Sequence, residues 1–209
     1  CSGTVSNLTV KNVNINAPQC RYVGVISGSG GTFTNCKVVF STTSSVTGDW
    51  YVGGISGVEG KFTDCTVESM SENPVVRGNS MVGGLVGWCY SVIESCVVNA
   101  IVVGAENVGG IVGSGRPSIK CCSFQGKVEG ESRIGGIMGA YENWHTSSLM
   151  HGCKVDAEVI ASKSSAGGLI GYNYNDGLKV VGCYTRGTVN APASCGGLVG
   201  DRSRHCGCY

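Results

Sequence analysis

Short apolar stretches separated by glycine and polar residues run along the whole chain, and no segment has the spacing of an amphipathic helix. After Cys122, Cys153 and Cys183, small or apolar residues alternate with charged residues or Thr, as in CSFQGKV at 122–128. A period of two is typical of a half-buried strand. The pattern therefore predicts short strands joined by turns, with two or three strands in each repeat.

A six-residue motif with glycines recurs along the sequence. Its seven copies are VGVISG (23–28), VGGISG (52–57), VGGLVG (82–87), VGGIVG (108–113), IGGIMG (134–139), AGGLIG (166–171) and CGGLVG (195–200). Their starts lie 29, 30, 26, 26, 32 and 29 residues apart. Periods of this size are typical of arrays in which each repeat buries its apolar face against its neighbours.

A second block aligns on cysteine. Its copies are FTNCKV (33–38), FTDCTV (62–67), IESCVV (93–98), IKCCSF (119–124), MHGCKV (150–155) and VVGCYT (180–185), and VSNLTV (5–10) has Leu8 at the cysteine position. The cysteines that share this register are Cys36, Cys65, Cys96, Cys122, Cys153 and Cys183. We expect this series to form one column in the core.

Together the two blocks predict an all-β fold, a right-handed parallel β-solenoid of about seven coils spanning residues 1–209 as a single repeat domain. Coils about 4.8 Å apart give a rod about 35 Å long. We expect the paired glycines to take positive φ where a side chain would clash with the next coil. The chain opens within one cysteine block and stops within another, so we expect a fragment of a longer array.

The composition argues against several classes of protein function. The net charge is +1 and 14% of the 209 residues are charged, so the electrostatic footprint of a nucleic-acid-binding protein is missing. No apolar stretch reaches the roughly 18 to 20 residues of a membrane span, and no signal segment opens the chain. We expect no nucleic acid, no membrane span and no cofactor.

Cysteine is the most unusual component, with 13 copies. Aligned cysteines in stacked coils have Cβ atoms about 4.8 Å apart, beyond the roughly 3.8 Å of a disulfide, which predicts free buried thiols. Outside that register, a disulfide from Cys195 to Cys206 or Cys208 is a candidate staple. The segment His205–Cys208 lacks the spacing of a zinc knuckle, so no metal site is expected.

The VGGLVG motif, followed by a strand ending in Asn-Cys or its equivalent and then Gly-x-Val, resembles the GLUG repeat. The resemblance covers nearly the whole chain. It implies a β-solenoid stalk or adhesive region of a secreted or cell-surface protein, without catalytic residues of its own. The extra cysteines and the segment around Trp144 depart from that pattern.

Two insertions, 140–149 and 172–179, carry aromatic residues and have the composition of surface loops. Our candidate ligand-binding residues are Tyr141, Trp144, His145, Tyr172 and Tyr174. The expected partner is a protein or glycan on a host or neighbouring cell. The alternative is that these aromatic residues only pack their own loops.

Two other functions stay open. The first is a filament subunit that associates end to end. The second is a glycan-active enzyme, which needs paired carboxylates. Three residues after the aligned cysteines stand Val39, Glu68, Asn99, Gln125, Asp156 and Arg186, so adjacent repeats do not offer two acids there. We therefore expect a non-catalytic structural or adhesive module.

Overall fold

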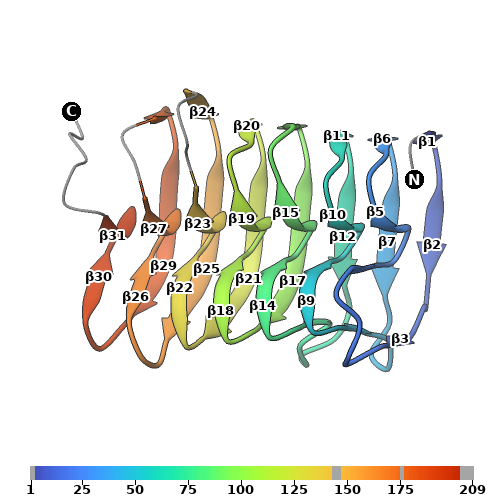
Figure 1. The fold of residues 1–209 in the computed structure, drawn as a ribbon, viewed down its shortest axis with the longest axis horizontal. Helices are drawn as coiled ribbons and strands as arrows, with labels where there is room; N and C mark the ends of the chain where they lie inside the picture. The colour runs from blue at the N-terminus through green and yellow to red at the C-terminus, as the bar shows by residue number, and fades with distance from the viewer. Residues whose placement is uncertain (1–2, 143–146, 175–176, 203–209) are drawn as a thin grey trace.

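The computed structural model describes residues 3–142, 147–174 and 177–202, and within these residues every regular element is a β-strand. The chain winds through about seven coils whose strands pair in parallel with those of the next coil (Figure 1). The all-β parallel solenoid predicted from the repeats is thus confirmed. No helix of the described residues is long and apolar enough to cross a membrane.

The coils build four sheets, here called A to D, which the chain visits in that order. Sheet A contains β1 (Thr4–Ser6), β6 (Thr32–Thr34), β11 (Lys61–Thr63), β16 (Val92–Glu94), β20 (Ser118–Lys120), β24 (Ser148–His151) and β28 (Leu178–Val181). Sheet B contains β2 (Thr9–Lys11), β3 (Ile15–Asn16), β7 (Lys37–Phe40), β8 (Val46–Thr47), β12 (Thr66–Ser69), β13 (Val76–Arg77), β17 (Val97–Val103), β21 (Ser123–Gly130), β25 (Lys154–Ala161) and β29 (Tyr184–Asn190).

The glycine motif joins the other two sheets. Sheet C contains β4 (Val23–Gly24), β9 (Trp50–Gly53), β14 (Ser80–Gly83), β18 (Glu106–Gly109), β22 (Ser132–Gly135), β26 (Ser165–Gly167) and β30 (Ser194–Gly196). Sheet D contains β5 (Ser27–Ser29), β10 (Ser56–Val58), β15 (Val86–Cys89), β19 (Val112–Gly115), β23 (Met138–Tyr141), β27 (Ile170–Asn173) and β31 (Val199–Arg202).

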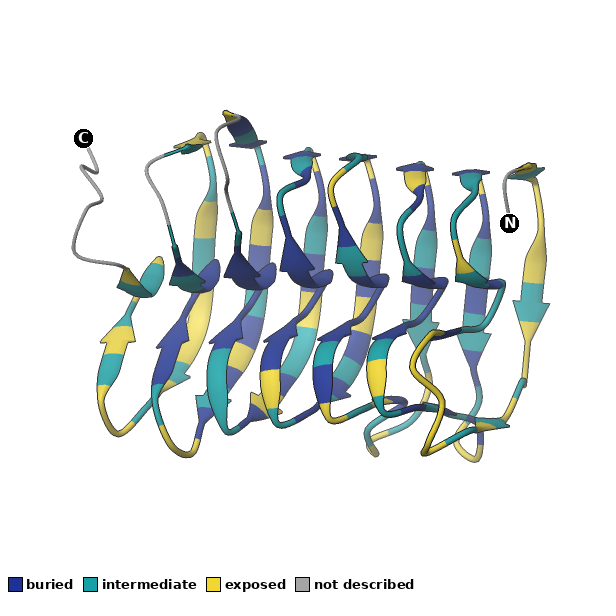
Figure 2. Cartoon of the chain, in the orientation of Figure 1, coloured by how far each residue is buried: buried dark blue, intermediate teal, exposed yellow. Residues whose placement is uncertain are grey.

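Like residues stack on like residues in the core because the register repeats from coil to coil. In sheet A, Phe33 pairs with Phe62 and Phe62 with Ile93, and the two phenyl rings stack with centroids 5.1 Å apart. In sheet B, Val67 pairs with Val98 and Val98 with Phe124. These side chains are buried, and Figure 2 shows the buried residues concentrated along the middle coils.

The corner between sheets A and B explains the cysteine block. The residue before the aligned cysteine has positive φ at Asn35, Asp64, Ser95 and Cys121, between 52° and 54°. Asn and Asp enter this left-handed region more readily than most residues. The turn directs the next side chain inward, so Cys122 is buried while its neighbour Cys121 is exposed.

The aligned cysteines lie one above another inside this corner. Cys36, Cys65, Cys96, Cys122 and Cys153 are buried, and Cys183 is half-buried. Most of these thiols donate to a carbonyl of the preceding coil, as from Cys65 to Phe33 at 3.5 Å and from Cys122 to Ile93 at 3.7 Å. Burial raises the pKa of the Cys153 thiol to about 12. All six are free thiols in this structure.

The paired glycines act differently from our expectation. None of them has positive φ; the left-handed residue stands just before the motif, as at Tyr51 and Met81. Glycine is required because backbones approach one another closely. A Cβ on Gly84 would lie 2.7 Å from Val98 Cγ1 and collide with the Gly110 carbonyl of the next coil. The clash was predicted correctly, but the positive φ was wrong.

The last glycine of the motif packs sheet D against sheet C. A Cβ on Gly87 of β15 would lie 2.6 Å from both Gly57 O and Val52 N, which belong to the preceding coil. The same contact recurs at Gly113, whose Cβ would lie 2.5 Å from Gly87 O. The two sheets therefore meet backbone to backbone, with no room for side chains between them.

Candidate functional site

Tyr141 does not belong to an exposed loop, which corrects its assignment as a ligand-binding residue. It is the last residue of β23, and its side chain is fully buried. Its register partners are Gly115 and Asn173, both buried residues of sheet D. Its hydroxyl donates to Gly177 O at 3.3 Å. The strand includes the first two residues of the expected insertion, Ala140 and Tyr141, and Tyr141 takes an inward position.

Tyr172 and Tyr174 do lie together at the surface. Tyr172 is on β27 and Tyr174 follows that strand; both are half-buried, with ring centroids 4.5 Å apart. Arg133, from β22 of the preceding coil, places its guanidinium 5.8 Å from the Tyr172 ring and 5.9 Å from the Tyr174 ring. Arg133 also donates to Asn107 Oδ1 at 3.2 Å. The other two candidates, Trp144 and His145, lie outside the described residues.

A second aromatic pair on sheet D was missed by the sequence reasoning. Trp88 is half-buried, Tyr90 is 49% exposed, and their rings meet edge to face with centroids 5.2 Å apart. Arg116 lies over the Tyr90 ring at 5.5 Å. Trp88 Nε1 donates to Glu142 Oε2 at 3.4 Å, and Ser114 Oγ donates to Glu142 Oε1 at 2.7 Å.

Glu59, which lies in the preceding coil, accepts hydrogen bonds from the segment that contains Tyr90. Its Oε1 accepts from the Tyr90 N–H at 3.2 Å and its Oε2 accepts from Ser91 Oγ at 3.4 Å. Burial raises the pKa of the Glu59 carboxyl, while these two hydrogen bonds lower it. The backbone of the Tyr90 segment is thereby anchored to the preceding coil.

The two aromatic pairs lie on one face because the coils stack in register. Trp88 pairs with Ser114, Ser114 with Ala140, and Ala140 with Tyr172. These four strands lie side by side in Figure 1. Two residues further along each coil come Tyr90, Arg116, Glu142 and Tyr174. We call the following set the aromatic surface: Trp88, Tyr90, Arg116, Arg133, Glu142, Tyr172 and Tyr174.

A third group of rings lies on the earlier coils of sheet C. Tyr22 stacks on Tyr51 with centroids 5.4 Å apart, and Trp50 lies 6.1 Å from Tyr51. Arg21 lies over the Trp50 ring at 5.5 Å. This group repeats the combination of tyrosine, tryptophan and stacked arginine that the aromatic surface shows.

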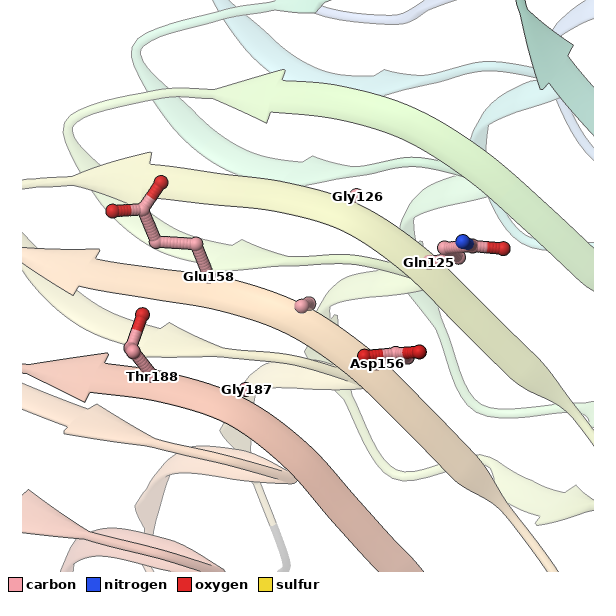
Figure 3. A pocket seen from close by; sticks show the side chains of 7 residues that line it. Gln125, Gly126, Asp156, Glu158, Gly187 and Thr188 are labelled. Atoms are coloured by element: carbon pink, nitrogen blue, oxygen red, sulfur yellow. The ribbon is translucent and has the colours of Figure 1, made fainter.

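An open depression on sheet B is the candidate for catalysis (Figure 3). Its lining residues are Gln125, Gly126, Asp156, Ala157, Glu158, Gly187 and Thr188. Arg186 forms an ion pair with Asp156 and lowers the pKa of that carboxyl. Lys127 Nζ lies 3.7 Å from Glu158 Oε2. A glycosidase needs one carboxyl that stays protonated as general acid, whereas Asp156 is held ionised.

The off-register cysteine Cys195 is exposed and free, and its thiol donates to Val189 O at 3.2 Å. Its expected partners, Cys206 and Cys208, lie outside the described residues, so that disulfide stays a prediction. Within the part of the chain that the structure describes, no three His, Cys, Asp or Glu residues gather closely enough to hold a metal ion.

Comparisons of the chain with models of protein families, with curated proteins and with solved structures gave no match. The resemblance to GLUG repeats therefore rests on the motif copies alone.

Proposed function

We propose that this chain is a non-catalytic structural and adhesive module of an exported protein, displayed at the cell surface or outside the cell. The observation that carries the proposal is the aromatic surface, seven side chains from four successive coils that a continuous buried core holds in fixed register. Tyr, Trp and Arg are the residue types most enriched at the energetic centres of recognition surfaces.

The lining of the depression on sheet B suits a binding surface or a solvated strand face better than a site of glycan cleavage. Its carboxylates have cationic neighbours, with Arg186 beside Asp156 and Lys127 beside both Glu158 and Glu129. Arg186 lowers the pKa of the Asp156 carboxyl, which makes that carboxyl unsuited to act as a protonated general acid. An exported location is proposed from the resemblance of the motif copies to GLUG repeats, with a protein or glycan of a host or neighbouring cell as the partner.

Adhesion is tested with beads coated with the purified 209-residue chain. We expect them to attach to cells or extracellular matrix more than albumin-coated beads do, and to attach less when Trp88 and Tyr172 are both changed to Ala. Location is tested by protease treatment of intact producing cells, which should cleave the chain without lysis. Attachment no better than albumin, or full protection from the protease, would refute the proposal.

A further inference from the structure

We infer that the aromatic surface binds an extended, uncharged polysaccharide whose chain runs along the axis of the coils. This inference rests on the proposed function and names the class of its ligand. A sugar ring offers an apolar face, which packs on an aromatic ring, and a rim of hydroxyl pairs, which planar polar side chains bind. Trp88 and Tyr172 supply rings, and Arg116, Arg133 and Glu142 supply the polar groups.

The direction of the ligand follows from the register. Trp88 and Tyr172 occupy the same column of sheet D and are half-buried, whereas Ser114 and Ala140, which stand between them in the register, are fully buried. With coils about 4.8 Å apart, the two ring platforms are about 14 Å apart along the axis. A pyranose unit in an extended chain is close in length to one coil, so about three units span the three coil steps between the two platforms.

Glu142 is suited to bind hydroxyls between the two platforms. Each of its carboxylate oxygens accepts one hydrogen bond from the protein, from Ser114 and from Trp88. A carboxylate has about four acceptor positions in total. The side chain is therefore fixed in orientation and still has acceptor capacity for a ligand.

Charge favours a neutral polymer over an anionic one. The guanidiniums of Arg116 and Arg133 are offset by the carboxylates of Glu59, Glu106 and Glu142, and Arg133 lies 3.9 Å from Glu106. Both arginines also stack on tyrosine rings. A surface that selects polyanions needs an excess of positive charge. Here the two arginines and the three carboxylates, with Glu59 and Glu106 counted beside the aromatic surface, sum to a formal charge of −1.

A protein partner is the competing occupant, because the same residue types form protein hot spots. Such an interface has an apolar, desolvated centre. Here the half-buried Glu142 carboxylate lies between the two platforms, held by the fully buried Ser114 hydroxyl, which donates to Glu142 Oε1 at 2.7 Å. A polar centre between two ring platforms suits a glycan better.

The test is retention of the full 209-residue chain on insoluble polysaccharides. The neutral probes are amorphous cellulose, chitin, xylan and curdlan, and the anionic probes are calcium alginate and pectate gels. We expect binding to at least one neutral probe, weakened at least about ten-fold in Trp88→Ala and in Tyr172→Ala. Tyr184→Ala is the matched control, since Tyr184 is 53% exposed on sheet B. Circular dichroism and the urea midpoint verify that each variant is folded.

Three results would overturn the inference. They are no retention on any neutral probe, retention limited to alginate or pectate, and neutral binding that Trp88→Ala and Tyr172→Ala leave unchanged. If coated beads still attach to cells through the aromatic surface while all neutral probes fail, the ligand is a protein: the glycan inference is wrong and the proposed adhesive function stands. If the beads also fail to attach, both are wrong.

Discussion

Adding one methyl group at the second glycine of the motif tests the stacking most directly. Gly84 and Gly197 occupy the same motif position in different coils, and neither has positive φ. A Cβ on Gly84 would collide with the Gly110 carbonyl, whereas a Cβ on Gly197 meets no atom within 4 Å. The variants Gly84→Ala and Gly197→Ala therefore differ in the presence of a coil above the new methyl.

The cost at Gly84 follows from the contacts. Val98 Cγ1 would lie 2.7 Å from the new carbon, about 1 Å inside the ordinary contact distance. Overpacking of this kind costs about 1–3 kcal/mol. The Gly110 segment is held by the bond from Gly110 N to Gly135 O at 3.1 Å. Weakening one or two such bonds adds about 1 kcal/mol each.

Both variants also stiffen the unfolded chain, which stabilises the folded state by about 0.4–1 kcal/mol. Gly84→Ala should thus lose about 2–4 kcal/mol of unfolding free energy, and Gly197→Ala should gain about 0.5 kcal/mol. Urea unfolding followed by circular dichroism measures both, provided that the m-values agree. Equal midpoints for the two variants would refute backbone contact between coils as the reason for the glycines.

A pulse of iodoacetamide on the native protein should label the exposed Cys20, Cys121 and Cys195 and spare the buried aligned cysteines, which react after unfolding. Disulfides found among the aligned cysteines by mass spectrometry would contradict this prediction. Phe62→Ala should cost about 3–5 kcal/mol in urea unfolding because it empties a fully buried site against Phe33, and Phe62→Leu should cost less. Arg186→Ala should raise the pKa of Asp156 toward its ordinary value, as seen by NMR titration. Because the pKa of Asp156 is lowered in the native state, the ion pair stabilises the fold above the ordinary Asp pKa of about 3.9, and this stabilisation is lost as the pH falls through the lowered native pKa. An Asp156 titration that is the same in Arg186→Ala as in the unchanged protein would exclude the ion pair.

The sequence was sufficient to predict the architecture because the constraints are local and repeated. Each cysteine block contains its own corner, as the left-handed Asn35 before Cys36 illustrates. Each glycine motif contains its own close contact. Copies that recur at nearly constant spacing can be aligned without knowledge of the fold, and their stacking then follows.

The aromatic surface could not be predicted in the same way. Trp88 and Tyr172 share a column, but Ser114 and Ala140 stand between them in the register, so no repeated residue type marks that column. Arg133 reaches the Tyr172 ring from another sheet. Tyr141 was misassigned because the end of β23 within the insertion depends on pairing with β19 and β27. One signal was available, since Trp88 and Tyr172 each directly follow the last glycine of a motif.

That signal links the fold to the function. Side chains alternate along a strand, so Trp88 points to the face opposite that of Gly87. The inward position has no room, because a methyl on Gly87 would lie 2.6 Å from Gly57 O and from Val52 N. The column that contains Trp88 accepts residues as different as the fully buried Ser114 and Ala140 and the half-buried Tyr172.

The free energy of unfolding should therefore fall more for the small change at Gly87 than for the large change at Trp88. Gly87→Ala adds one carbon and should cost about 3 kcal/mol, because backbone must move. Trp88→Ala removes a whole indole and should cost about 1 kcal/mol, since the ring is half-buried at the surface. Urea unfolding compares the two free energies, and a larger loss for Trp88→Ala would show that the ring supports the core. A smaller loss for Trp88→Ala would show that the solenoid depends on the glycine and not on the indole, which leaves the Trp88 side chain available for the proposed binding.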